Sequence, residues 1–419
     1  MPKINITPFI LLSVFYLVID NYVLKGVLVL AAATGTNSNA ADWVWWLCSF
    51  GLLLFFLIVF ARALKERKMK AAFKIVLNLF LVLLFSKLVF LVFLASEDVY
   101  RTINYLLNGV FHARWLFPAR SIYFSGLGLV AAVASCVAFL FGVTAGKYHY
   151  KVHETTLFFD DLPDAFDGFK IAQISDIHAG SFDNVQEVQK GVNLINEQKP
   201  DLFLFTGDLV NNKADEIEPY LDIFKQIKAP YGCFSVLGNH DYGDYITWRN
   251  ADDKLKNLEL LKSYHRQLGY KLLLDEHQLI EKDGQYIAVV GVENWGQGFG
   301  ERGDLTKALN GLKPESFKIL LSHDPSHWDA QVKLNVIKIH LTLSGHTHGM
   351  QFGFEIGKFK WSPVKYRYPN WAGLVEENGK HLYVNRGFGF LGFSGRVGIW
   401  PEITIITLKR KRGLKDIRC

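Results

Sequence analysis

Four long apolar segments occupy the first 150 residues of this chain, and they constrain its fold more than any other feature. They run over residues 7–32, 43–61, 71–95 and 121–145. Each is close to the ~20 residues that an α-helix needs to cross the hydrocarbon core of a bilayer. After residue 150 the composition is that of an ordinary globular domain. The sequence therefore predicts a transmembrane helical region over 1–150 and a separate domain over 151–419.

A few ionisable residues interrupt these apolar segments. Asp20 and Lys25 lie in the first segment, and Lys74 and Lys87 lie in the third. An ionisable side chain inside a membrane span is a candidate functional group, because leaving it unpaired in lipid is costly. The alternative is a position near the interface, and only Lys87 is expected to lie deep.

The distribution of basic residues predicts an orientation. The first loop, from Thr34, has no Lys or Arg, whereas the second, from Ala61, and the third, over 96–120, both contain them. These basic residues are Arg62, Lys65, Arg67, Lys68 and Lys70 in the second loop, and Arg101, Arg114 and Arg120 in the third. By the positive-inside rule the second loop is cytoplasmic, which places both termini and the 151–419 domain in the cytoplasm.

The charge and the cysteines exclude other classes of protein. The formal charge of +6 is concentrated near the apolar segments and in the tail from Lys409 to Arg412. Membrane lipids explain these clusters better than nucleic acid does, because no recognition motif accompanies them; a solvated chain end is the alternative for the tail. Cys48, Cys136, Cys233 and Cys419 show no CxxC or paired spacing, so no disulfide framework is expected.

From residue 151 onward, short apolar runs alternate with amphipathic stretches. The runs FKIAQIS, DLFLFTGD, YGCFSVLGNHD, YIAVVGV, FKILLSHDP and IHLTLSGHTHG have the length and composition of buried strands. Helical spacing appears over 184–197, 214–228 and 251–268. This alternation predicts a layered α/β domain.

Polar side chains that bind metals follow five of the predicted strands. They are Asp176 and His178, then Asp208, then Asn239, His240 and Asp241, then His323 and Asp324, and finally His346 and His348. The carboxyl ends of strands form the ligand-binding edge of an open α/β sheet. Five successive strand ends with buried, unpaired charge would be costly, and bound metal would compensate them. Oxygen and imidazole ligands without thiolate suit manganese, iron or zinc.

The ordered series DxH, GD, GNHD, a lone His and GHTH resembles the calcineurin-like metallophosphoesterase family, and in particular its membrane-attached bacterial branch. The resemblance covers about residues 165–410, including the closing run PEITIITL. It implies a four-layer α/β/β/α sandwich, preceded here by about four transmembrane helices. It also implies two divalent metal ions, with manganese expected and iron or zinc as alternatives, and a multi-pass protein of a bacterial inner membrane.

The resemblance assigns a role to each residue of the series. The first metal would be held by Asp176, His178, Asp208 and His348, and the second by Asp208, Asn239, His323 and His346. His240 would contact the phosphate and protonate the leaving oxygen, and Asp241 would orient His240. A metal-bridging hydroxide would attack phosphorus. This chain departs from the family at Asn211 and Met350, which are not ligand positions.

Substrate determinants are less clear from the sequence. Arg386 and Arg396 are candidates to meet phosphate oxygens. Several aromatic residues near the motifs could form a wall for an acyl chain or a nucleobase, or could instead cap a small sheet. These are Trp295, Phe299, Trp361, Tyr366, Tyr368 and Trp371.

Three functions are compatible with these features. The first is hydrolysis of a phosphodiester, pyrophosphate or phosphomonoester at the membrane, with a lipid-linked phosphate among the candidate substrates. The second is a phosphoprotein or nucleotide phosphatase that is merely anchored. The third is a membrane sensor or scaffold whose metal domain only binds; the complete ligand set argues against it.

Overall fold

The computed structural model describes residues 7–66, 71–112, 115–357 and 359–411. Among the residues singled out above, Arg67, Lys68, Lys70, Arg114, Arg412 and Cys419 lie outside the described residues, and so do the side chains of Lys65 and Lys74. The chain divides into two compact units, Met1–Val143 and Thr144–Cys419, each of which is considered by itself. Cys48, Cys136 and Cys233 are free thiols.

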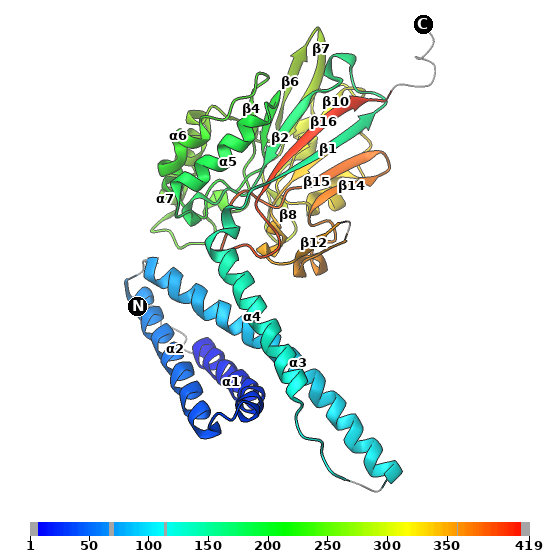
Figure 1. Cartoon of the computed structure of the whole chain (residues 1–419). Helices are drawn as coiled ribbons and strands as arrows, with labels where there is room; N and C mark the ends of the chain where they lie inside the picture. The colour runs from blue at the N-terminus through cyan, green and yellow to red at the C-terminus, as the bar shows by residue number, and fades with distance from the viewer. Residues whose placement is uncertain (1–6, 67–70, 113–114, 358, 412–419) are drawn as a thin grey trace. The chain divides into compact units, whose positions relative to one another are not determined.

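Four helices make up the N-terminal unit (Figure 1): α1 Thr7–Ala33, α2 Ser38–Glu66, α3 Ala71–His112 and α4 Ile122–Thr144. All four are long and apolar enough to cross a membrane. Large apolar side chains such as Trp43, Leu47 and Leu116 are exposed, whereas Tyr16 and Phe80 are buried between helices. An apolar exterior around a packed interior is what a helical unit in lipid requires.

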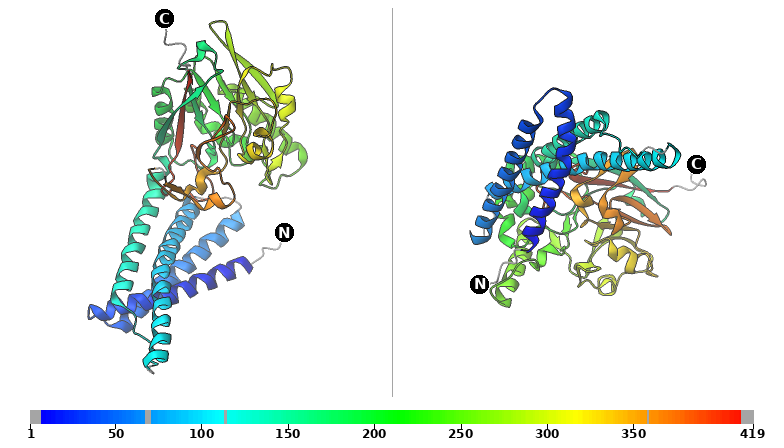
Figure 2. Two further views of the ribbon diagram at one scale, coloured as in Figure 1. Left: turned by 90° about the vertical axis from the view of Figure 1, so that its right-hand side faces the viewer. Right: turned by 90° about the horizontal axis from the view of Figure 1, so that it is seen from below.

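The third helix is longer than the sequence indicated. The apolar segment was expected to end at residue 95 and to be followed by a loop over 96–120, but α3 continues to His112 and is the longest of the four (Figure 2). Polar side chains on this extension have helical partners, since Arg101 pairs with Asp98 three residues earlier at 2.7 Å. The hydroxyl of Thr102 donates to the carbonyl of Asp98 at 2.7 Å. No proline interrupts the extension before Pro118.

An ion pair inside the helical unit joins three of its helices. Asp20 of α1 is fully buried, and its Oδ1 lies 2.5 Å from Nζ of Lys87 of α3. The hydroxyl of Ser49 of α2 donates to the same carboxylate. The Lys87 ammonium also donates to the Tyr16 hydroxyl at 2.8 Å. The charge of Lys87 is thus compensated within the unit, and a deep position in the membrane stays a prediction.

The C-terminal unit contains two six-stranded sheets. The first has the order β1-β16-β2-β3-β4-β5 and the second the order β14-β15-β11-β10-β7-β6. The strands of the first sheet are β1 Lys151–Phe159, β16 Glu402–Arg410, β2 Lys170–Ile174, β3 Leu202–Phe205, β4 Cys233–Ser235 and β5 Lys271–Leu272. Those of the second are β14 Gly373–Glu377, β15 Lys380–Val384, β11 Leu341–Ser344, β10 Phe317–Leu321, β7 Gln285–Gly291 and β6 Glu276–Lys282. Strands β2 to β5 are parallel, as are β7, β10, β11 and β15.

Each sheet buries one face against the other sheet and one face against helices. The inner layer includes Ile171, Leu204, Ile319 and Leu343, all fully buried. Helices α5 Val185–Glu197, α6 Leu221–Phe224 and α7 Ala251–Gln267 lie on the outer face of the first sheet (Figure 1). Helix α8 Leu305–Leu309 and the turn around Trp328 cover the second sheet. The result is the expected four-layer α/β/β/α sandwich.

Two details differ from the expected elements. The stretch 214–228 forms a 3₁₀ helix over Ala214–Tyr220 followed by the short α6, because Pro219 lies inside it and cannot donate a helical hydrogen bond. The second is that several strands were not foreseen, namely β1, β5, β6, β14, β15 and those of two small hairpins. The hairpins are β8 Trp295–Gly296 with β9 Gly300–Glu301, and β12 Phe354–Ile356 with β13 Phe359–Trp361.

Candidate metal centre

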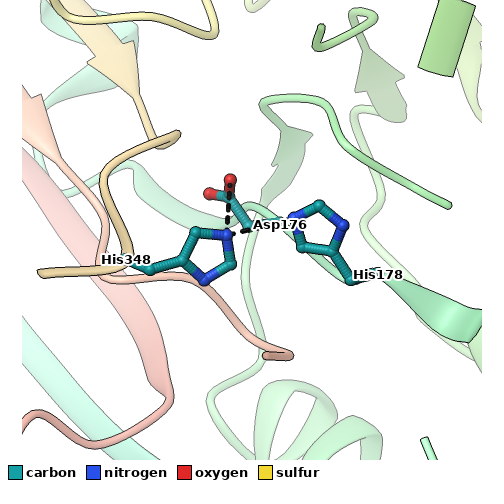
Figure 3. Close-up of side chains that lie close together, drawn as sticks. All are labelled: Asp176, His178 and His348. Atoms are coloured by element: carbon teal, nitrogen blue, oxygen red, sulfur yellow. Dashed lines mark hydrogen bonds and ion pairs between the residues drawn. The ribbon is translucent and has the colours of Figure 1, made fainter. Parts of the chain in front are cut away.

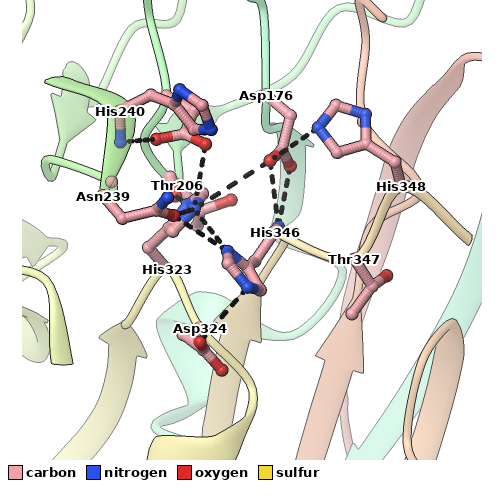
Figure 4. A network of polar contacts seen from close by, with 12 residues as sticks. Asp176, Thr206, Asn239, His240, His323, Asp324, His346, Thr347 and His348 are labelled. Atoms are coloured by element: carbon pink, nitrogen blue, oxygen red, sulfur yellow. Dashed lines mark hydrogen bonds and ion pairs between the residues drawn. The ribbon is translucent and has the colours of Figure 1, made fainter. Parts of the chain in front are cut away.

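The five strand ends meet in one buried cluster. The loops after β2, β3 and β4 of the first sheet face the loops after β10 and β11 of the second, and their polar side chains converge (Figure 4). Asp176, His178 and His323 are fully buried, and Asp208 is 1% exposed. The structure thus brings together side chains that are up to 172 positions apart in sequence, between Asp176 and His348.

The backbone at these strand ends is unusual. Five of the clustered residues have φ between 47° and 69°, the left-handed region that side chains other than glycine rarely adopt: Asp176, His178, Asp208, His346 and His348. Such backbone costs of order 1–3 kcal/mol per residue and persists where the surroundings enforce it, most often at functional sites. Here it turns the chain sharply as it leaves each strand and directs the side chains to one point.

Two glycines allow the loops to approach one another. A Cβ added at Gly345 would lie 1.9 Å from Oγ of Ser175 and 2.3 Å from Oδ2 of Asp176. At Gly238 it would lie 2.2 Å from Oδ1 of Asp208. Any side chain at either position would push the two strand-end loops apart and open the cluster.

One side of the cluster is formed by Asp176, His178 and His348. The two imidazoles lie on either side of Asp176 (Figure 3), with Nε2 of His348 3.3 Å from Oδ1 of Asp176. The Nε2 atoms of His178 and His348 are 3.1 Å apart. Oδ2 of Asp208 lies 3.4 Å from Nε2 of His178.

The other side is formed by Asn239, His323 and His346. Oδ1 of Asn239 lies 2.9 Å from Nδ1 of His346 and 3.1 Å from Nε2 of His323. Oδ2 of Asp208 lies 3.2 Å from Nε2 of His323. Asp208 therefore lies between the two sides, as expected of a carboxylate shared by two ions.

Contacts on the far side of two imidazole rings, those of His323 and His346, fix which ring nitrogen faces the centre. Nδ1 of His323 donates to the carbonyl of Thr206 at 2.8 Å, which leaves its Nε2 facing the centre. Nε2 of His346 meets the Tyr368 hydroxyl at 3.0 Å and Oδ2 of Asp324 at 3.3 Å, which leaves its Nδ1 inward. Partners of this kind hold metal-ligating histidines in the ligating tautomer.

The electrostatics also suit cations. Burial opposes the charge of Asp176 and Asp208, but neighbouring histidines outweigh it and hold both carboxyl pKa values below their usual range. Burial lowers the pKa of His178 to about 3 and also lowers that of His346. Burial opposes the charge of His323, yet Asp208 raises its pKa to about 10. Among the described residues, the ion-pair partners of Asp176 and Asp208 are histidines alone.

This donor set fits divalent metal ions. Asp176, His178 and His348 each offer a ligand atom within 4.8 Å of the others, and so do Asp176, Asp208 and His323. Buried carboxylates without Lys or Arg, facing imidazole nitrogens that point inward, form an arrangement that a cation stabilises.

His240 and Asp241 lie beside the cluster in different roles. Nδ1 of His240 donates to the carbonyl of Asn211 at 2.8 Å, and its ring stacks on Tyr245. Asp241 was expected to orient His240, but its carboxylate instead accepts from the backbone N–H groups of Gly238, Asp208 and Leu209 at 2.8–2.9 Å. Asn211 orients His240 through its main chain. The Asp241 carboxylate instead stabilises the loop that carries Asp208.

The two arginines are engaged elsewhere. The guanidinium of Arg386 pairs with Glu355 at 2.7 Å and with Glu402 at 2.6 Å. Arg396 is fully buried and donates to backbone carbonyls, including that of Gly389 at 2.6 Å. Its Nη2 also lies 3.3 Å from Nδ1 of His348. Contact of Arg386 with a phosphate stays a prediction, and its charge already has two carboxylate partners.

The aromatic residues divide into two groups. Phe299 and Tyr368 contact His346, with ring centroids 4.6 Å and 5.5 Å away. Trp371 packs in a small apolar cluster with Val364, and Trp361 belongs to the β12–β13 hairpin.

Sequence reasoning missed three of the supporting groups, the main chain of Asn211 and Thr206 and the side chain of Tyr245. Asp324 and Tyr368 were singled out in the sequence, but their contacts with His346 were not predicted. These contacts come from loops without a sequence pattern.

Two family models match the chain. One described as "Probable Calcineurin-like phosphoesterase, transmembrane domain" matches residues 6–147, and one described as "Calcineurin-like phosphoesterase" matches residues 169–350.

Curated relatives agree with these models. An uncharacterized metallophosphoesterase of Bacillus subtilis, YkuE, is 32% identical over 59% of this chain and 82% of its own length. An uncharacterized metallophosphoesterase of Campylobacter jejuni, Cj0846, is 27% identical over 87% of this chain and 98% of its own length. The UDP-2,3-diacylglucosamine pyrophosphatase LpxG of Chlamydia trachomatis is 26% identical over 64% of this chain and 93% of its own length. With its four-layer sandwich and the side chains that cluster at its five strand ends, the chain belongs to the calcineurin-like metallophosphoesterase family, whose members hydrolyse phosphoesters.

Proposed function

We propose that this protein hydrolyses a phosphodiester or pyrophosphate bond at a membrane, with residues 1–150 as the transmembrane region and 151–419 as the catalytic domain. The observation that carries the proposal is the convergence of seven candidate ligand side chains, with Asp208 between the other six, in one buried cluster. A phosphomonoester is the second substrate class that this centre could take.

The ligands divide into two sets that share Asp208. Asp176, His178 and His348 complete one set, and Asn239, His323 and His346 complete the other. Two divalent ions, with manganese the first candidate, would supply Lewis acidity that activates a water and neutralises charge developing on the phosphate.

His240 is placed to act on the phosphate. Because its Nδ1 proton is held by the Asn211 carbonyl at 2.8 Å, Nε2 is the nitrogen left for the substrate. Its backbone N–H donates to Oδ1 of Asp208 at 2.9 Å, so the ring stays beside the ligands without being one. From this position Nε2 would donate a proton to the leaving oxygen. Asp241 supports this step by fixing the Asp208 loop.

A lipid-linked phosphate is the substrate that the chain's organisation favours. Four helices long and apolar enough to span a bilayer precede the catalytic domain. A relative that is 26% identical is named for hydrolysis of a diacylated sugar nucleotide. The proposed location is a bacterial inner membrane with the catalytic domain in the cytoplasm. Anchored phosphatase activity on nucleotides or phosphoproteins is the alternative.

The decisive test is loss of one shared ligand in the full chain. The purified protein with Mn²⁺ should hydrolyse bis(p-nitrophenyl) phosphate, and Asp208→Asn should abolish both hydrolysis and binding of metal. The matched control is Asp222→Asn, at an exposed carboxylate on α6. If no mono- or diester is hydrolysed with Mn²⁺, Fe²⁺ or Zn²⁺, the enzymatic proposal is wrong.

A further inference from the structure

A pocket of about 480 Å³ opens beside the metal centre. Three segments line it: the β8–β9 hairpin, the loop after His323, and residues 367–370. Its size lies within the range of roughly 300–1,000 Å³ that is typical of small-molecule sites.

Tyr368 connects this pocket to the proposed ligands. It lines the pocket, and its hydroxyl lies 3.0 Å from Nε2 of His346 and donates to Oδ2 of Asp324 at 3.1 Å. Pro325 and Ser326, which follow Asp324 directly, line it as well. A group bound here would therefore lie one side chain away from His346.

Hydrogen bonds and a ring contact connect the segments that line the pocket. The backbone N–H of Gln297 donates to Oγ of Ser326 at 2.9 Å. Nη2 of Arg367 donates to the carbonyl of Gln297 at 3.1 Å. The Trp295 ring lies against His327, with centroids 5.1 Å apart, which fixes the indole in the wall. These contacts join the segments that line the pocket to one another.

The wall combines flat rings with hydrogen-bonding groups. Trp295 and Tyr368 supply aromatic surface, whereas Glu301, Asp329, Arg367 and Asn370 supply carboxylates, a guanidinium and an amide. An acyl chain would cover these polar groups without replacing their hydrogen bonds to water, which is unfavourable. A hydroxylated ring would pack against the indole and donate its hydroxyls to the carboxylates.

We propose that this pocket binds a hydroxylated ring, a nucleoside or a sugar, that is esterified to the phosphate under attack. The inference rests on the proposed function, because it places the phosphate at the ligand cluster next to His346. It separates two parts of the substrate: the polar ring enters this pocket, and any acyl part lies outside it.

The test compares diesters that share one leaving group. The full chain with Mn²⁺ is assayed on methyl p-nitrophenyl phosphate, thymidine 5′-(p-nitrophenyl phosphate), and the p-nitrophenyl diester of a hexose phosphate. At least one ring-bearing diester should have a kcat/KM about tenfold or more above the methyl diester, in line with the contribution of ring stacking. Which of the two is preferred identifies the ring as nucleoside or sugar.

Variants then locate the preference in the pocket. Glu301→Gln and Trp295→Ala should lower the ratio of the two kcat/KM values by about fivefold or more, each through loss of a contact to the ring. Glu315→Gln, at an exposed carboxylate outside the pocket, is the control and should leave the ratio unchanged. Glu301 is itself exposed, so its conservative replacement tests the pocket even if the tryptophan variant does not fold.

The results distinguish the two proposals. If the wild-type protein hydrolyses the methyl diester with no preference for either ring, or if the preference survives both pocket variants, the pocket assignment is wrong while the proposed function stands. If no diester is hydrolysed at all, the proposed function itself fails. In that case the pocket is judged by calorimetric binding of thymidine 5′-phosphate, which Trp295→Ala should weaken and Glu315→Gln should not.

Discussion

At the scale of single residues, substitution of His240 should affect catalysis without affecting metal binding. Its Nδ1 donates to the Asn211 carbonyl and its ring stacks on Tyr245, so the ring is held by groups other than the candidate ligands. We expect His240→Ala to lower kcat by about 10²–10⁴-fold, the range of a lost general acid, and to leave the metal content unchanged. Steady-state kinetics and elemental analysis of the same preparation check this. Equal loss of metal would make His240 a ligand.

Tyr245 is a second residue whose effect can be isolated. The Nδ2 group of Asn239 donates to the Tyr245 hydroxyl at 2.7 Å, and this directs Oδ1 of Asn239 toward His323 and His346. Without the hydroxyl the amide is free to rotate. Tyr245→Phe should weaken the binding of Mn²⁺ by about tenfold while kcat at saturating Mn²⁺ stays close to that of the wild type.

A manganese titration of activity measures both effects in one experiment. Tyr366→Phe removes a hydroxyl from an exposed ring and serves as the control. A fall in kcat at saturating metal with unchanged affinity would instead assign Tyr245 to the substrate.

The sequence predicted which strand-end side chains would cluster better than it predicted the groups that support them. Residues such as Asp176 and His346 follow apolar strands within recognisable motifs, so strand position and residue type together indicate a shared site. Tyr245 and Tyr368 act through loops whose paths depend on the assembled sheets. The role of Asp241 was misassigned because sequence adjacency to His240 suggested contact, whereas the turn directs its carboxylate to the backbone of Asp208.

At the scale of elements, Asp20 and Lys87 fasten α1 to α3. The carboxylate is fully buried and the two charged atoms are 2.5 Å apart. Removing one partner of a buried pair leaves an uncompensated charge, which costs about 3–5 kcal/mol. Lys87→Met should therefore lower the unfolding temperature sharply, and adding Asp20→Leu should restore most of the loss.

Thermal unfolding of the full chain in detergent measures this comparison. Lys25→Met, at an exposed lysine of α1, is the control and should have little effect. If the double variant is no more stable than the single one, the pair does not act as a unit.

Element boundaries were predictable where periodicity and composition agreed. Helices α5 and α7 match the expected 184–197 and 251–268 within a residue or two. The end of α3 was missed because hydropathy falls after residue 95, whereas helical propensity and the Asp98–Arg101 pair continue the helix to His112. Hydropathy indicates which residues partition into lipid, and it does not indicate where a helix ends.

At the scale of the whole molecule, the extension of α3 bears on the orientation. At 1.5 Å per residue, the 37-residue candidate span of α3, Ile75–Phe111, is about 56 Å long, more than the ~30 Å of a hydrocarbon core. Two arginines of the expected third loop have acidic partners, so they are weaker evidence for the orientation. Arg120 pairs with Glu97 and Asp98 at 2.8–2.9 Å. Arg101 also pairs with Asp98. The basic second loop is therefore the stronger topological signal, and it favours a cytoplasmic catalytic domain.

Fusions to reporter proteins test this orientation directly. Green fluorescent protein fused after Cys419 should fluoresce, and alkaline phosphatase fused there should be inactive, because four spans return the chain to the side on which it began. Alkaline phosphatase inserted after Asn37, in the first loop, should be active and controls for expression. Active phosphatase at the C-terminus together with an inactive insertion after Asn37 would invert the topology and place the metal centre outside the cytoplasm. If both fusions were active, the number of spans would be odd, and α3, with its long apolar stretch, would be the first helix to re-examine.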